Sequence, residues 1–156
     1  MWYHEVWVMG RLRVQHCIVN AVTRQYGAGP TSDLLGVDYF RTVPADTEFP
    51  KSLSKLELFV RFIGDDGIAG RVRITISRPW VSGEDRELVY RTLFDIATPG
   101  VSGRVVHDRS FKLINVLVPG EGTYAVRVMR GVRRPWEANR GWRVLAVEYF
   151  HIARAT

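Results

Sequence analysis

The sequence has one cysteine and only three lysines in 156 residues. A lone cysteine excludes an intramolecular disulfide, and the apolar run Cys17-Ile18-Val19 predicts a small buried side chain in a reducing compartment. Because lysine is scarce, arginine supplies most of the 22 basic residues, against 16 acidic ones. A GC-rich genome produces this bias as readily as a function does, so the net charge of +6 favours anionic partners without identifying one.

Long apolar runs are also missing. No segment reaches the roughly 18 uninterrupted apolar residues of a spanning helix, so we expect no membrane span. The residues from Met1 to Glu5 show no basic region, apolar core or cleavage site, so we expect no secretory signal. These absences favour a soluble cytoplasmic protein.

The length and the hydrophobic content of 46% are those of one domain with a continuous core. A chain of this size needs neither a metal nor a disulfide to hold that core together. No linker, internal repeat or low-complexity segment divides the sequence. We therefore predict a single domain over residues 1–156.

Helical periodicity is nearly absent, and apolar residues alternate with polar ones as in half-buried β-strands. The clearest alternation covers residues 55–62 and resumes at 71–77 after a loop rich in glycine and aspartate. We predict that these two segments pair as a β-hairpin. Together with a later strand, they are expected to contribute one shared core, formed by Leu56, Leu58, Val60, Phe62, Val72, Ile74, Ile76, Tyr124, Val126 and Val128.

About nine strands are expected in all, so the predicted fold is all-β. The favoured architecture is an antiparallel two-sheet β-sandwich of Greek-key or jelly-roll type, and the alternative is a closed β-barrel. Residues 42–54, with Pro44 and Pro50, are expected to form an ordered crossover between sheets. The remaining strands are predicted at 3–9, 13–25, 35–42, 87–97, 104–117, 123–130 and 142–153.

One tyrosine favours the sandwich over the barrel. Tyr124 begins a strand directly after the turn Pro119-Gly120-Glu121-Gly122, as the tyrosine corner of Greek-key sandwiches does. We predict that its ring is buried and that its hydroxyl bonds to the backbone of the preceding turn.

From Leu35 onward the order of features resembles an uncharacterised family of small bacterial β-sandwich proteins, a domain of unknown function. The resemblance implies a sandwich fold and a bacterial source, and it supplies no activity and no catalytic residue. It is carried by Leu35-Gly36-Val37-Asp38, Phe49-Pro50, the strand Leu56 to Phe62, Phe111 to Leu113 and Gly122-Thr123-Tyr124.

No motif announces catalysis, a metal or a cofactor. No serine stands in a nucleophile elbow, and neighbouring His107 and Asp108 would point to opposite faces of a strand, which argues against a triad with Ser110. The four histidines lie far apart, and the pair Asp65-Asp66 is too small for a calcium site. We therefore predict no catalytic residue, no metal ligand and no cofactor.

One segment combines arginine with tryptophan. Guanidinium groups bind phosphate with two hydrogen bonds, and indole rings stack on bases or sugars, so this composition suits a loop that binds single-stranded nucleic acid or a glycan. The alternative is a solvated hairpin loop whose tryptophans fold onto the sheet edge with arginines stacked on them. The candidate binding residues are Arg130, Arg133, Arg134, Trp136, Arg140, Trp142 and Arg143, with at least one tryptophan partly accessible.

A second basic face follows from the predicted hairpin. If the hairpin closes symmetrically, Arg61 lies opposite Arg73, with Arg71 one step nearer to the turn. Like charges opposite each other across a ladder are unfavourable. A compensating partner is expected, either Glu57, an acid of a neighbouring strand or an external anion.

The leading hypothesis is a non-catalytic binding or assembly module with an unknown protein partner, because a rigid β scaffold presents these loops without reaction machinery. Binding of single-stranded or backbone-directed nucleic acid is the first alternative, and an enzyme with a site assembled from several strands is the second. Homo-oligomerisation through a strand edge or an apolar sheet face stays open.

Overall fold

The computed structural model describes residues 12–19, 22–25, 32–35, 40–53, 56–65, 69–78, 87–97, 104–132 and 141–156. Within these ranges the protein is all-β, as predicted, and no helix long and apolar enough to cross a membrane is found. The strands are β1 (Arg13–Val19), β2 (Val22–Gln25), β3 (Ser32–Leu35), β4 (Phe40–Val43), β5 (Lys51–Leu53), β6 (Leu56–Asp65), β7 (Ala69–Arg78), β8 (Glu87–Ala97), β9 (Arg104–Leu113), β10 (Val116–Val118), β11 (Gly122–Val132) and β12 (Gly141–Arg154).

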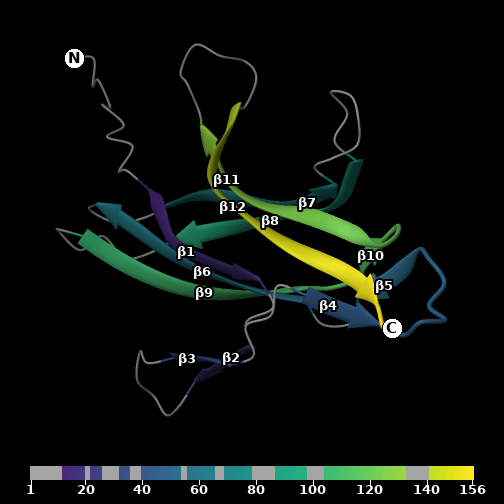
Figure 1. Ribbon diagram of the computed structural model, residues 1–156. Helices are drawn as coiled ribbons and strands as arrows, with labels where there is room; N and C mark the ends of the chain where they lie inside the picture. Colours follow the sequence, from purple (N-terminus) through teal and green to yellow (C-terminus); the bar gives the residue numbers. More distant parts are fainter. Residues whose placement is uncertain are drawn as a thin grey trace, which may run out of the picture.

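Two sheets carry most of the structure. A five-stranded sheet has the order β4-β12-β11-β7-β8, and a three-stranded sheet has the order β1-β6-β9. Figure 1 shows the three-stranded sheet beneath the curled five-stranded sheet. The pairs β5–β10 and β2–β3 form separate two-stranded sheets. The main sheets are antiparallel except at β4, which runs parallel to β12, so the architecture is mixed rather than purely antiparallel.

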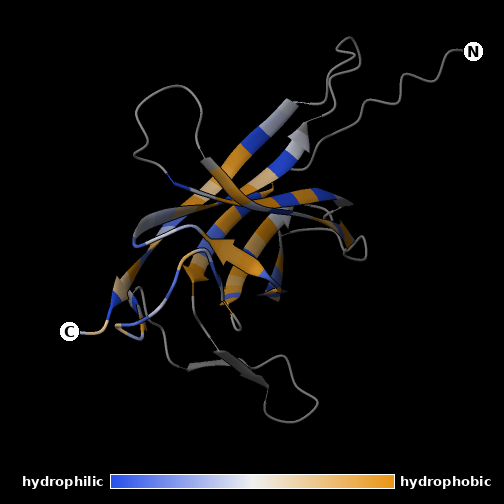
Figure 2. Ribbon diagram, turned by 90° about the vertical axis from the view of Figure 1, so that its right-hand side faces the viewer, coloured by the Kyte–Doolittle hydropathy of each residue, from blue (hydrophilic) through white to orange (hydrophobic). Residues whose placement is uncertain are grey.

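The predicted core is confirmed. All ten residues expected to point inward are at most 1% exposed, and they belong to one cluster fed by both main sheets. Phe94 of β8 and Phe111 of β9 join the sheets directly, with ring centroids 4.4 Å apart. Leu53 of β5 and Val116 of β10 are buried in the same cluster. Figure 2 shows the alternation of apolar and polar residues along the strands that makes this possible.

The predicted hairpin of residues 55–62 with 71–77 is wrong. Strand β6 pairs with β1 and β9, whereas β7 pairs with β8 and β11 in the other sheet. The chain therefore changes sheets between β6 and β7 instead of turning back within one sheet. Alternation could not reveal this, because a strand buries the same face whether its sequence neighbour lies beside it or across the core.

Strand boundaries differ most where the prediction joined two elements. The segment 13–25 contains β1 and β2, and 104–117 contains β9 and β10. The second break lies at Ile114-Asn115, where Asn115 adopts a φ of 59°, a conformation that asparagine tolerates better than most residues. With these divisions, ten strands of four or more residues and two three-residue strands replace the expected nine. The predicted strand at 3–9 lies outside the described residues.

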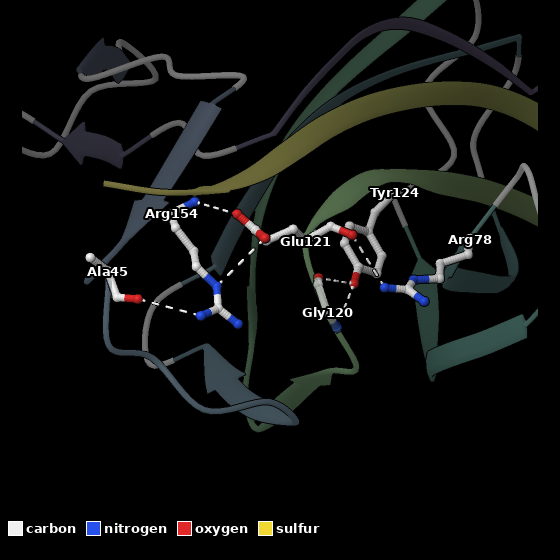
Figure 3. Close-up of polar contacts among 6 residues, drawn as sticks. All are labelled: Ala45, Arg78, Gly120, Glu121, Tyr124 and Arg154. Atoms are coloured by element: carbon white, nitrogen blue, oxygen red, sulfur yellow. Dashed lines mark hydrogen bonds and ion pairs between the residues drawn. The ribbon is translucent and has the colours of Figure 1, made fainter. Parts of the chain in front are cut away.

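The prediction for Tyr124 is confirmed. Its side chain is fully buried, its hydroxyl donates to the carbonyl oxygen of Gly120 at 2.5 Å, and the amide of Gly120 donates to the same hydroxyl at 3.3 Å. The ring stacks on Phe150 of β12, with centroids 5.4 Å apart. Figure 3 shows how this hydroxyl ties the turn before β11 to the strand itself.

The same turn is held from outside by two arginines (Figure 3). Arg78, at the end of β7, donates to the carbonyl oxygen of Glu121 at 3.2 Å. The carboxylate of Glu121 accepts a hydrogen bond of 2.8 Å from the backbone amide of Arg154. Its other oxygen lies 3.5 Å from Nε of the Arg154 guanidinium. These contacts join the ends of β7 and β12 to the turn before β11, so this end of the five-stranded sheet is fixed.

We expect Tyr124→Phe to lower the free energy of unfolding by about 1 kcal/mol or somewhat more, because the carbonyl and amide of the half-buried Gly120 lose their partner while the ring packing is retained. Urea unfolding followed by circular dichroism measures this difference. Tyr149→Phe is the matched control, since Tyr149 is exposed, and its effect should be negligible. Equal effects of the two substitutions would contradict the structural role of the Tyr124 hydroxyl.

Candidate interaction surface

The arginine- and tryptophan-rich segment lies at the junction of β11 and β12. Arg133, Arg134, Trp136 and Arg140 lie outside the described residues. The other three predicted residues are described, and the register places Arg130 opposite Arg143 and Trp142 opposite Gly131. Trp142 is half-buried, which confirms the prediction that one tryptophan of this segment is partly accessible.

Trp142 stacks on an arginine that the sequence prediction assigned to another site. Its ring lies 3.8 Å from the guanidinium carbon of Arg73, a residue of β7, although β11 separates the two strands. The indole crosses β11 over Gly131, where an added Cβ would lie 3.7 Å from Cζ3 of Trp142. A larger side chain at this position would occupy the space of the ring. The tryptophan therefore folds back onto the sheet and holds the Arg73 cation in place.

Arg130 and Arg143 are cross-strand neighbours of like charge. Burial lowers the pKa of Arg130, and the nearby charge of Arg143 lowers it further. Arg143 itself is exposed. The pair gives the β11–β12 end a local positive charge.

The predicted basic face of Arg61, Arg71 and Arg73 does not exist as one surface. Arg61 lies on the three-stranded sheet, and the other two lie on the five-stranded sheet. Arg61 makes a two-point ion pair with Asp108 of β9, with nitrogen–oxygen distances of 2.7 and 2.8 Å. Arg71 pairs with Asp95 of β8 at 3.1 Å. The compensating partners are therefore acids of neighbouring strands, one of the options that the sequence left open.

The hydrogen bonds from Arg61 hold the pKa of Asp108 below its usual range, although partial burial acts against them. Because the pKa of Asp108 is lower in the folded protein than in the unfolded chain, its ionised carboxylate stabilises the fold at pH values above the unfolded pKa of about 4. This stabilisation is lost as the pH falls through the folded pKa. We expect Asp108→Asn to cost less than about 1 kcal/mol at neutral pH, because both side chains are partly exposed. The cost should fade as the pH falls below the unfolded pKa and through the lower folded one.

Urea unfolding of the parent and Asp108→Asn at several pH values measures this dependence. Asp95→Asn is the matched control, because its ion pair with Arg71 is more exposed and should contribute less. A cost for Asp108→Asn that stays constant through the acid range would show that the carboxylate charge is not responsible.

The outer face of the five-stranded sheet, opposite the core, exposes large apolar side chains on two of its strands. Cross-strand partners point to the same face, so the register defines this surface. On β8, Leu93 is the cross-strand partner of Arg73, and Leu88 is that of Ser77. On β12 the exposed apolar residues are paired with residues of β11: Val144 with Met129, Val147 with Arg127 and Tyr149 with Ala125. These five apolar side chains are 40–53% exposed, and they are the larger part of the exposed large hydrophobics among the described residues.

Between these apolar strands the outer face has small and basic residues. Ala125, Thr75 and Ser77 are buried there, and Arg127 donates to Ser77 Oγ at 2.6 Å. Arg73 and Arg91 make no ion pair with a carboxylate of the described residues. Burial lowers the pKa of Arg73, and the like charge of Arg91 adds to this effect. The outer face therefore combines two apolar flanks, which are the exposed apolar residues of β8 and of β12, with the positive charge of arginines that have no carboxylate partner among the described residues.

Sequence reasoning missed these apolar residues because it searched for loops and for alternation. The available signal was the failure of alternation, since Leu88-Val89, Leu93-Phe94 and the run Val144 to Val147 place apolar residues on consecutive positions. In an antiparallel sheet that covers one core, consecutive apolar residues put one of them on the solvent side.

Three groups of the described part bear on the search for a catalytic or metal site. His107 and Asp108 are consecutive in β9 and point to opposite faces, and Asp108 is engaged by Arg61. Burial raises the pKa of the Cys17 thiol to about 12, with a further contribution from the charge of Glu148, so the reactive thiolate is scarce at neutral pH. Among the described residues, no group of three or more histidine, cysteine or acidic side chains is arranged to hold a metal ion.

Comparison with known proteins adds no family. The chain matches no protein-family model, and no curated protein is significantly similar to it. The resemblance to the bacterial β-sandwich family therefore stays a prediction.

Proposed function

We propose that this protein is a non-catalytic binding or assembly module that uses the outer face of its five-stranded sheet. The supporting observation is the set of five exposed apolar side chains on β8 and β12, with arginines between them. Exposed apolar residues grouped along a strand on the solvent side of a sheet typically mark an interaction site, because their exposure to water is unfavourable. The two groups lie on β8 and β12, with β7 and β11 between them.

The scaffold proposed for this module is a two-sheet sandwich rather than a closed barrel. Supporting it, the two main sheets share a core while each has its own ladder, and among the described residues no ladder links β8 to β9 or β1 to β12. Membership of the bacterial sandwich family and a cytoplasmic location belong to the same proposal, supported by the features quoted from the sequence.

Nucleic-acid binding is the second candidate, and the neighbouring Arg130 and Arg143 favour it. Both residues can contact phosphate groups at the β11–β12 end. The stacking of Trp142 on Arg73 counts against it, because one face of that indole is already covered. Tryptophan quenching by mixed single-stranded oligonucleotides, lost at high salt, would support this candidate.

The module hypothesis predicts that the protein belongs to a larger complex in the cells that naturally produce it. We expect the tagged protein to elute from size-exclusion chromatography of a native extract well above the mass of a monomer. Leu93→Asp/Val147→Asp should elute as a monomer, because two carboxylates on the apolar flanks would have to be desolvated on binding.

The matched control is Ile114→Asp/Leu117→Asp, which places the same charges on exposed apolar residues outside the outer face. This variant should elute with the parent. Monomeric elution of the parent protein, or equal loss of the complex in both variants, would contradict a binding role for the outer face.

A further inference from the structure

We propose that the outer face binds an acidic amphipathic segment of a partner protein, whose carboxylates contact Arg73 and Arg91 and whose apolar side chains cover Leu93, Val144 and Tyr149. This inference rests on the proposed function and names the chemistry of the partner. The carrying observation is the position of two unneutralised arginines on this face: Arg73 of β7 lies between the two apolar strands, and Arg91 lies on β8, between Leu88 and Leu93 along the strand.

The charge of the surface favours an anionic partner. Arg73 faces Leu93 and Arg91 faces Thr75, so their cross-strand neighbours on β8 and β7 supply no carboxylate. Among the described residues, the acid that β8 places opposite β7 on this face is Asp95, and it is already paired with Arg71. A carboxylate placed here would form charge-assisted hydrogen bonds with the guanidinium of Arg73, which Trp142 already holds in position, and with that of Arg91.

The width of the surface fits a single segment. From β12 to β8 there are three inter-strand steps, or about 14 Å at a spacing near 4.8 Å. An α-helix with its side chains is about 10–12 Å wide, so one amphipathic helix can contact both apolar flanks at once. Acidic residues beside its apolar face would then lie over the arginines.

Charge complementarity disfavours a second copy of the same chain. Two outer faces in contact would bury the arginines of both copies, Arg73, Arg91 and Arg127, in one interface, and Asp95, the acid of this face among the described residues, already pairs with Arg71. Such an excess of like charge in a desolvated interface is unfavourable.

The apolar flanks favour protein over nucleic acid. Interfaces with nucleic acid are more polar than those between proteins, and they use free aromatic faces for base stacking. Here the exposed residues beside the arginines are mainly aliphatic, and Trp142 is stacked on Arg73.

The test is a selection from a random peptide display library against the purified full-length protein. We expect the selected peptides to combine aspartate or glutamate with leucine, isoleucine or aromatic residues. Arg73→Glu/Arg91→Glu should weaken the binding of a selected peptide by about tenfold or more in fluorescence anisotropy. Replacing the peptide's acids by glutamine should weaken binding to the parent to a similar extent.

The matched control is Arg13→Glu/Lys112→Glu, which changes the net charge equally at exposed positions of the three-stranded sheet. It should alter peptide affinity by less than about twofold, because charges beyond a Debye length are screened at physiological salt. Equal weakening by both double variants would overturn the proposal, because a general field would then explain the binding.

Three further outcomes would also overturn the proposal. These are selected peptides without acids, a concentration-dependent dimer abolished by Leu93→Asp, and a labelled mixed single-stranded oligonucleotide that competes with the peptide and binds more tightly. The two failures are distinguishable. If Leu93→Asp/Val147→Asp dissociates the native complex while Arg73→Glu/Arg91→Glu leaves it intact, the proposed function holds and the acidic-partner proposal fails. If neither variant differs from the parent, the proposed function itself fails.

Discussion

Val60→Asp will leave the domain unfolded at room temperature. Val60 is fully buried in β6, the central strand of the three-stranded sheet, opposite Cys17 of β1 and Arg109 of β9. A carboxylate at this point loses its hydration inside an apolar core, and the cost of several kcal/mol is comparable to the total stability of about 5–15 kcal/mol expected for a domain. Circular dichroism and a thermal melt of the purified variant measure the outcome.

The matched control is Val106→Asp, which puts the same change on an exposed residue of the same sheet. It should melt close to the parent. A Val60→Asp protein that also melts within a few degrees of the parent would show that the inward assignment of β6 is wrong.

Phe111→Ala is expected to lower the free energy of unfolding by about 3–5 kcal/mol, the usual cost of removing a buried aromatic ring. Phe111 is 2% exposed in β9 and contacts Phe62 edge-on at 6.5 Å, in addition to Phe94 across the core. Its loss therefore opens a cavity where the two main sheets meet. Urea unfolding gives the free energy, and Phe111→Leu, which keeps most of the volume, should cost much less.

A double-mutant cycle with Phe94→Ala isolates the contact between the sheets. Phe94 belongs to the five-stranded sheet, and Arg109 covers the pair, with its guanidinium carbon 5.5 Å from the Phe94 ring and 5.1 Å from the Phe111 ring. We expect a coupling energy of about 0.5–1.5 kcal/mol. Additivity of the two substitutions within experimental error would mean that the sheets do not depend on this contact.

The candidate surface was only partly visible in the sequence. Composition located Trp142, Arg130 and Arg143, because clustered arginine and tryptophan are unusual in one connection. It could not show that Trp142 stacks on Arg73, which is 69 positions away in the chain. The indole reaches Arg73 across β11 at Gly131, so the contact exists only after three strands have assembled.

The partners of Arg61 show the same limit. The predicted hairpin placed this residue opposite Arg73, yet it pairs with Asp108 in the other sheet. The charge itself was evident, and so was the need for a compensating group. Which acid supplies it was decided by the pairing of β6 with β9, two strands separated by β7 and β8 in the chain.

The sequence by itself determined which side chains face the core and where several of the turns lie. Alternation assigned the inward residues of β6, β7 and β11 correctly, and the glycine turn before Tyr124 indicated its buried hydroxyl, because both signals depend on neighbouring residues. The tertiary structure alone decided which strands are neighbours and which apolar residues remain on the outer face. Strand pairing is a contact between segments that are distant in the chain. Alternation fixes which face of a strand is buried, and the same face is buried whichever strand lies beside it, so alternation does not determine the neighbours.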